Sequence, residues 1–211
     1  MLNATRVTAA LWALGVELVI AAAVWVYYRR RTVARADRYV TFWPRFWAQS
    51  VDALVLCPLS LAAAIASSTV ASNEVAVIVA GAQNVVWFGY TAIMHGRFGQ
   101  TVGKMVTKVR VVDAKTEEPI TWRQAFLRES IPLAMSFASV AWLLVAPPAD
   151  LAAQDATASA VTPSSAAEWL LFALPVLWFA AEVITMLTNV KRRALHDFIA
   201  GTVAMRTNTR S

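Results

Sequence analysis

Residues 169–190 read WLLFALPVLWFAAEVITMLTNV, a continuous apolar run that holds a single ionisable residue, Glu182. A helix needs about 20 mainly apolar residues to cross the hydrocarbon layer of a bilayer, and this run has that length. Soluble domains of ordinary composition do not carry such runs. The segment therefore predicts a transmembrane helix.

Four further runs of the same character predict helices at residues 8–28, 46–67, 75–95 and 125–146. The sequence of 211 residues is 58% hydrophobic and 15% charged, whereas soluble domains are about 45–50% apolar and about 25% charged. One soluble core cannot bury so much apolar surface. We therefore expect an all-α membrane protein with about five transmembrane helices.

Two of these runs leave a question about the membrane boundary. Residues 8–28 are too long for the apolar part of a signal peptide, and three arginines follow them directly, so we expect a retained helix. The run at 125–146 carries Arg128 and Glu129 near its start and Pro132 shortly after. Because proline kinks or breaks a helix, residues 125–131 are either interfacial or membrane-spanning.

The basic residues cluster between the apolar runs instead of covering one surface. If the N-terminus lies outside, all of the 19 Lys and Arg residues except Arg6 lie inside or at the inner boundary. The outer loops then hold Glu74, Asp150, Asp155 and Glu168 and no basic residue. The positive-inside rule therefore predicts an outer N-terminus and a cytoplasmic C-terminus. The net charge of +6 follows from this topology, so we expect no nucleic-acid partner.

The long inner loop predicts a short cytoplasmic β-hairpin between the third and fourth helices. Residues 108–112 partly alternate polar with apolar, residues 113–119 form a polar turn, and residues 120–122 supply the second strand. A two-stranded hairpin alone is marginal in water. We therefore expect it to lean on the membrane surface or on another segment.

Ionisable side chains inside a membrane are costly and usually face a bundle interior or a water-filled path. Asp52 and Glu182 both lie roughly 10–14 Å from the inner edge of their spans, and Glu17 lies nearer the middle of its own. Asn84 adds a polar group to the third span. These four residues form a candidate ion path. The alternative is a structural role, in which they join helices by hydrogen bonds.

Arg45 lies on the same helix face as Asp52, two turns away. Helix neighbours that pair directly are three or four residues apart, so each of these side chains needs a partner elsewhere. Asp197 also lies at the inner boundary and is the candidate partner of Arg45. That pair predicts a structural clamp at the inner face.

No motif indicates catalysis, a metal or a cofactor, and we expect none of them. The run at 99–104 (GQTVGK) has one residue too few between its glycines for a phosphate-binding loop, and Met105 stands where a Ser or Thr is needed. His196 and Asp197 have no convincing nucleophile to complete a catalytic triad. Cys57 is the single cysteine and cannot form a zinc site alone.

Three stretches carry a family resemblance. They are residues 42–52 (FWPRFWAQSVD), residues 100–104 with 109–113 (QTVGK, VRVVD), and residues 193–203 (RALHDFIAGTV). In order and spacing they resemble the bacterial RDD family, named for an arginine and two aspartates. The family motifs are R-x-x-A-x-x-x-D, T-P-G-K…V-V-D and H-D-x-x-A-G-T-x-V. Val102 stands where proline is usual.

The resemblance implies a compact membrane domain at residues 40–206 in a bacterial inner membrane. Residues 1–31 are then an additional N-terminal helix, residues 32–39 a basic cytoplasmic linker and residues 207–211 a cytoplasmic tail. The resemblance implies that the signature residues are Arg45, Asp52, Asp197, His196, Gly103, Lys104, Gly201 and Thr202.

We weigh two functions, of which the resemblance implies only the first. The first is cation/proton exchange, in which Asp52 alternately binds a proton and a cation while Arg45 and Asp197 hold the inner gate. The second is a non-transporting accessory or scaffold protein that binds a membrane partner through its cytoplasmic loop or first helix. The expected partners are the bilayer, anionic lipid headgroups beside Lys104, and a second copy or another membrane protein.

Overall fold

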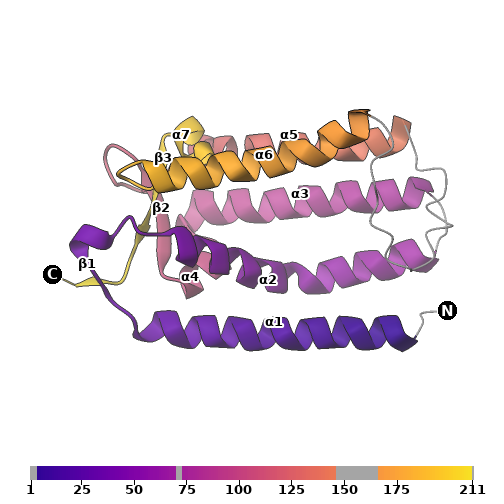
Figure 1. Cartoon of the computed structure of the whole chain (residues 1–211), viewed down its shortest axis with the longest axis horizontal. Coiled ribbons are helices and arrows are strands. Elements are labelled where there is room, and N and C mark those ends of the chain that lie inside the picture. The colour runs from indigo at the N-terminus through magenta and orange to yellow at the C-terminus, as the bar shows by residue number, and fades with distance from the viewer. Residues whose placement is uncertain (1–3, 70–72, 146–165, 211) are drawn as a thin grey trace.

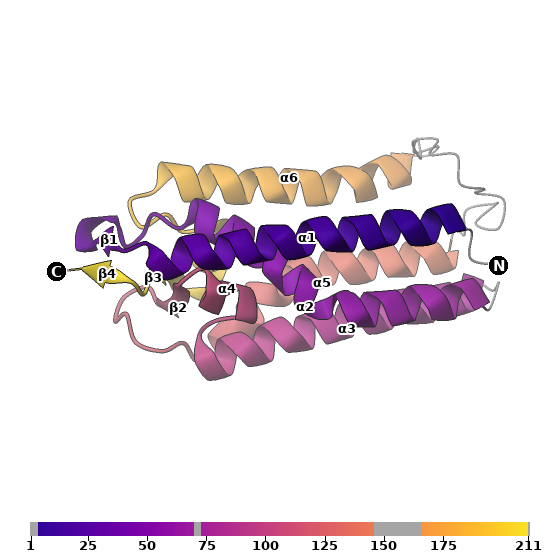
Figure 2. The same cartoon turned by 90° about the horizontal axis from the view of Figure 1, so that it is seen from below.

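A computed structural model describes residues 4–69, 73–145 and 166–210. Its long helices lie side by side along the longest axis of the molecule (Figures 1 and 2). They are α1 (Ala4–Arg30), α2 (Phe42–Thr69), α3 (Asn73–Phe98), α5 (Trp122–Val145) and α6 (Ala166–Thr188). Each predicted helical run is therefore a helix, with ends that differ from the prediction by a few residues.

Three of these helices, within the described residues, are long and apolar enough to cross a membrane. The qualifying segments are Phe42–Ala63 of α2, Val77–Phe98 of α3 and Trp169–Thr188 of α6. The chain is thus a mostly helical membrane protein. The helix α5 continues through Pro132 without a break from its start at Trp122.

The short elements gather at one end of the bundle, which we call the motif end (Figure 1). They are β1 (Val33–Ala34), a 3₁₀ turn (Arg35–Asp37), α4 (Val102–Val106), β2 (Val109–Asp113), α7 (Leu195–Ala200), β3 (Thr202–Arg206) and β4 (Thr209–Arg210). The segments predicted to share the cytoplasmic side therefore lie together. Asp150 and Asp155, predicted in an outer loop, lie outside the described residues.

The predicted hairpin is wrong in its second strand. The strand at 108–112 exists as β2, but it pairs antiparallel with β3, with Val111 opposite Ala204. Only an isolated bridge joins Val112 to Pro119, and Trp122 already begins α5. The physical reason is burial, because β3 offers Val203 and Ala204, both completely buried, whereas Trp122 in the predicted second strand is 50% exposed.

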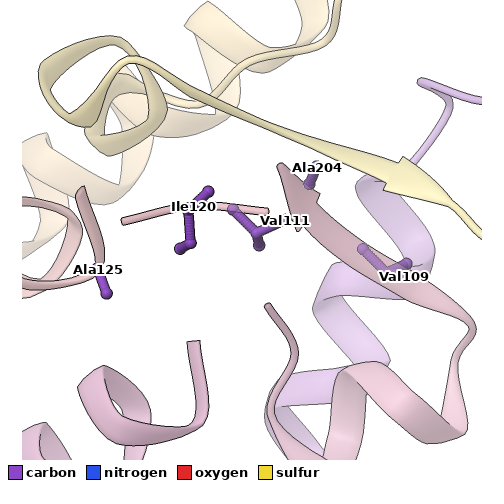
Figure 3. Packing of buried hydrophobic residues seen from close by; sticks show 5 residues of the cluster. All are labelled: Val109, Val111, Ile120, Ala125 and Ala204. Carbon is purple, nitrogen blue, oxygen red and sulfur yellow. The ribbon is translucent and has the colours of Figure 1, made fainter. Parts of the chain in front are cut away.

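The sheet β2–β3 forms a small core at the motif end. Val109, Val111 and Ala204 pack with Ile120 and Ala125, as Figure 3 shows. All but Ile120, which is 6% exposed, are completely buried. The strands therefore carry their own apolar core and join the segment before α5 to the end of α7.

The linker at 32–39 and residues 207–210 also lie at the motif end, where they form a second small sheet. β1 pairs in parallel with β4, with Val33 opposite Thr209. Arg38 makes an ion pair with Glu117 at 2.8 Å, and its carbonyl accepts a hydrogen bond from the backbone of Arg206 at 2.7 Å. The linker is thus fixed to the loop that follows β2.

Candidate functional site

Asp52 fastens the short helix α4 to α2. Its Oδ1 accepts hydrogen bonds from the Tyr90 hydroxyl at 2.6 Å and the Gly103 backbone at 2.7 Å, and its Oδ2 accepts one from Thr101 at 2.6 Å. Thr101 is itself the N-cap of α4 and accepts from the Lys104 backbone. A carboxylate at a helix start satisfies otherwise unpaired N–H groups. Asp52 is therefore a helix cap reached from a neighbouring helix.

The junction between α4 and α2 requires a glycine at position 103. A Cβ at this position would collide with the backbone carbonyl of Ala48 in α2. The absence of a side chain lets α4 approach α2 closely enough for the Gly103 N–H to reach Asp52. Asp52 of the first motif and Gly103 of the second motif therefore meet in one contact between α2 and α4.

Asp197 is the centre of a second cluster and is completely buried. Its Oδ2 lies 2.7 Å from Nη1 of Arg45, and its Oδ1 accepts a hydrogen bond from Nη1 of Arg128. Burial raises the pKa of this carboxyl, but Arg128 and Arg45 outweigh that effect and hold the pKa well below its usual value. The ionised carboxylate joins α2, α5 and α7.

The backbone around Asp197 is built to hold it. Its Oδ2 accepts from the backbone of Ala194 at 3.0 Å, which caps the start of α7. Gly201 ends α7 in the left-handed region at φ 68°, where glycine has no steric penalty. This turn brings Thr202 back to donate to Asp197 at 3.1 Å and to accept from Arg128 at 2.7 Å.

His196 connects the second cluster to α6. Its Nε2 lies 2.8 Å from Nη2 of Arg45 and 3.0 Å from Nη2 of Arg128, and guanidinium groups only donate. Nε2 must therefore accept, so the proton sits on Nδ1 and is donated to Glu182. Burial lowers the pKa of His196, which favours this neutral form.

His95 on α3 also lies between a basic and an acidic side chain, although its Nδ1 makes no hydrogen bond among the described residues. Nζ of Lys104 lies 2.7 Å from Nε2 of His95, and Nδ1 of that ring lies 3.4 Å from Oε1 of Glu129. Burial, followed by the charge of Arg128, lowers the pKa of Lys104 to about 8. Each histidine thus lies between a basic side chain and a glutamate.

A cavity of about 320 Å³ brings these groups together between α2, α3, α5 and α6. Its ionisable lining residues are Arg45, Asp52, His95, Lys104, Arg128, Glu129, Glu182 and His196. Apolar side chains also line it, among them Trp87, Phe179 and Trp178. The cavity is therefore a charged chamber in one half of the bundle. No group of three metal-ligating side chains is found among the described residues.

The structure brings together most, but not all, of the residues singled out from sequence. Asp52 and Glu182 both line the cavity, and Arg45 meets Asp197. Glu17 lies on an exposed face of α1, and Asn84 lies outside the cavity lining. The candidate ion path of four residues is thus reduced to two in this chamber.

Sequence reasoning missed Arg128, His95, Glu129 and Tyr90. Arg128 and Glu129 did carry a signal, because charged residues inside an apolar run usually have buried partners. Tyr90 carried none, since aromatic residues are common in such runs. Lys104 was expected beside lipid headgroups, but its amine turns inward to His95.

The fold and the cavity define a helical membrane protein with a buried charge network at one end. The RDD family matches residues 39–201 of this chain, so the chain belongs to the RDD family. The uncharacterized membrane protein YteJ of Bacillus subtilis (strain 168) is 32% identical over 99 residues. That similarity covers 44% of this chain and 60% of YteJ. No solved structure matches the chain.

Proposed function

We propose that this protein exchanges protons for a cation at the cavity of the motif end. The observation that carries the proposal is the meeting of Glu182, Glu129, His196 and His95 around one chamber of about 320 Å³. A carboxylate that faces a cavity can bind either a proton or a cation, and a histidine beside it can pass on the proton.

Glu182 is the residue that we assign to the exchange, in place of Asp52. The oxygens of Asp52 already accept hydrogen bonds from three donors that hold α4. Among the described residues, the Glu182 carboxylate has one side-chain donor, His196, and the Glu182 side chain is 18% exposed. A cation can therefore reach Glu182 without dismantling a helix cap.

The alternative is a non-transporting accessory protein that binds a membrane partner. The spans of α2, α3, α5 and α6 favour it, because residues 53–63, 77–94, 133–142 and 169–181 contain no charged side chain. Transport by one copy needs a polar path to both membrane faces. Under exchange, a second copy or another membrane protein would have to complete that path.

Proton flux in proteoliposomes distinguishes the two functions. Wild-type protein should move protons when a Na⁺ or K⁺ gradient is imposed, and Glu182→Gln should abolish the flux. Glu74→Gln is the matched control, since Glu74 is an exposed acid at the start of α3. Absence of flux in the wild type with both cations would reject exchange and favour the accessory role.

We further propose five transmembrane spans in a bacterial cytoplasmic membrane, with the N-terminus outside and the motif end in the cytoplasm. The positive-inside pattern supports this orientation. On a Cys57→Ser background, a membrane-impermeant maleimide should label Glu74→Cys in intact cells but not Lys115→Cys. Both sites are exposed. Labelling of Lys115→Cys alone would reverse the orientation.

A further inference from the structure

A second cavity, of about 690 Å³, lies between α1 and the beginning of α2. It shares no lining residue with the charged chamber. Its wall is largely apolar and aromatic, with Val24 and Tyr28 of α1 facing Trp43 and Trp47 of α2. We call it the α1–α2 groove.

Arg206 of β3 closes the groove at the motif end, and it is only 4% exposed. Its Nε donates to Asn208 at 3.2 Å, and its guanidinium lies over the ring of Tyr28 at 5.0 Å. Its Nη2 is buried and has no hydrogen-bond partner among the described residues. A buried charge without a counter-ion is strongly unfavourable. An anionic group bound in the groove would therefore stabilise Arg206.

The other charged side chains of the groove do not neutralise Arg206. Arg31 adds a second positive charge at the same end, with its guanidinium 5.1 Å from the ring of Tyr27. Asp37 also lines the groove, yet within the described part of the chain it makes no ion pair with Arg206. Two guanidinium groups at the end of the apolar α1–α2 groove match a ligand with an anionic head and an apolar tail.

We propose that the α1–α2 groove binds one anionic phospholipid, with its phosphate at Arg206 and Arg31 and an acyl chain against α1 and α2. Guanidinium groups bind phosphate through two parallel hydrogen bonds. The surrounding Tyr and Trp side chains are typical of the level of the lipid headgroups. The volume falls within the roughly 300–1,000 Å³ of ordinary ligand sites.

A lipid fits this site better than a soluble anion does. The apolar wall continues along α1 through Ile20 and Ala23, which free phosphate would leave uncovered. The groove also lies outside the matched family range on two sides, because α1 precedes residue 39 and Arg206 follows residue 201. The opposite wall, with Trp43 and Trp47 of α2, lies inside the matched range.

Native mass spectrometry of the full chain tests the proposal after the purified protein has been stripped of lipid in detergent. We expect phosphatidylglycerol to bind about tenfold more tightly than phosphatidylcholine, as one charge-assisted contact allows. Arg206→Gln and Arg31→Gln should each remove most of this preference. Arg29→Gln is the matched control, because it removes the same charge from the same exposed helix end outside the groove.

Two further arms keep the test decisive if Arg206→Gln does not fold. Arg31 is exposed, so Arg31→Gln should retain the fold, and Ala23→Trp should fill the apolar wall while keeping both arginines. Equal binding of the two lipids by the wild type would overturn the proposal. So would unchanged binding in Arg31→Gln and Ala23→Trp, an equal loss in Arg29→Gln, or displacement of the lipid by an equal concentration of inorganic phosphate.

Discussion

The two aspartates of the RDD motifs hold the structure together in different ways. Asp52 accepts hydrogen bonds from uncharged donors and caps α4, whereas Asp197 is neutralised by Arg45 and Arg128. Removing one partner of a buried ion pair leaves the other charge uncompensated, which is costly. The two signature aspartates therefore hold helices together, whereas the exchange proposed above is assigned to Glu182.

At the residue scale, Gly103→Ala should destabilise the protein by about 1–3 kcal/mol, the usual cost of overpacking. The added methyl group would collide with the Ala48 carbonyl and separate the Gly103 N–H from Asp52. Thermal unfolding in detergent measures the loss. Gly89→Ala is the control, since a Cβ there meets nothing within 4 Å. Equal stability of the two variants would contradict the close approach.

Lys104 gives a second residue-scale prediction. Its folded pKa is about 8, and that of a free lysine is about 10.4. Between these values the unfolded chain binds more protons, so stability should rise as pH is raised from 8 towards 10. Unfolding temperatures across this range should show the rise, and Lys104→Gln should abolish it. Lys115→Gln, at an exposed site, should leave the rise unchanged.

At the scale of elements, local patterns predicted helices better than strand partners. The apolar run of α2 was placed at 46–67, but the helix begins at Phe42, because a proline such as Pro44 is tolerated in a first turn. The partner of β2 could not be found locally, since β3 lies far along the chain and both strands are buried. Neighbouring segments offered a plausible but wrong hairpin.

A disulfide cross-link tests the register of β2 and β3. On a Cys57→Ser background, Arg110→Cys combined with Met205→Cys should form a disulfide on mild oxidation, because these positions are directly paired. Arg110→Cys with Thr209→Cys should not, since Thr209 pairs with β1 instead. Mobility on non-reducing gels reports the bond. Cross-linking in the second pair alone would contradict the observed sheet.

At the scale of the whole molecule, composition predicted a helical membrane protein, and the motifs predicted that its polar groups lie together. What the sequence could not reveal is the chamber itself. Its second arginine, Arg128, and its second histidine pair, His95 with Lys104, come from contacts between separate helices. Such contacts depend on helix rotation and crossing, which apolar runs do not specify.

The attachment of α1 gives a prediction at this scale. Tyr28 is 4% exposed and packs with Val24 and Val51, so Tyr28→Ala should cost about 2–4 kcal/mol through lost contacts and a cavity. Tyr27→Ala is the control, because Tyr27 is 50% exposed on the same turn. Unfolding temperatures in detergent compare them. Equal losses of stability in the two variants would show that the contacts of Tyr28 do not hold α1 against α2.

The ion pairs of Asp197 also have a consequence for biogenesis. Arg45 and Arg128 precede Asp197 in the chain, so the ribosome delivers both guanidinium groups to the membrane before their shared carboxylate exists. An isolated arginine is disfavoured in a hydrophobic environment. Both guanidinium groups therefore lack this counter-ion until the segment with Asp197 has been synthesised. The cluster around Asp197 can assemble only after α2, α5 and α6 have all been made.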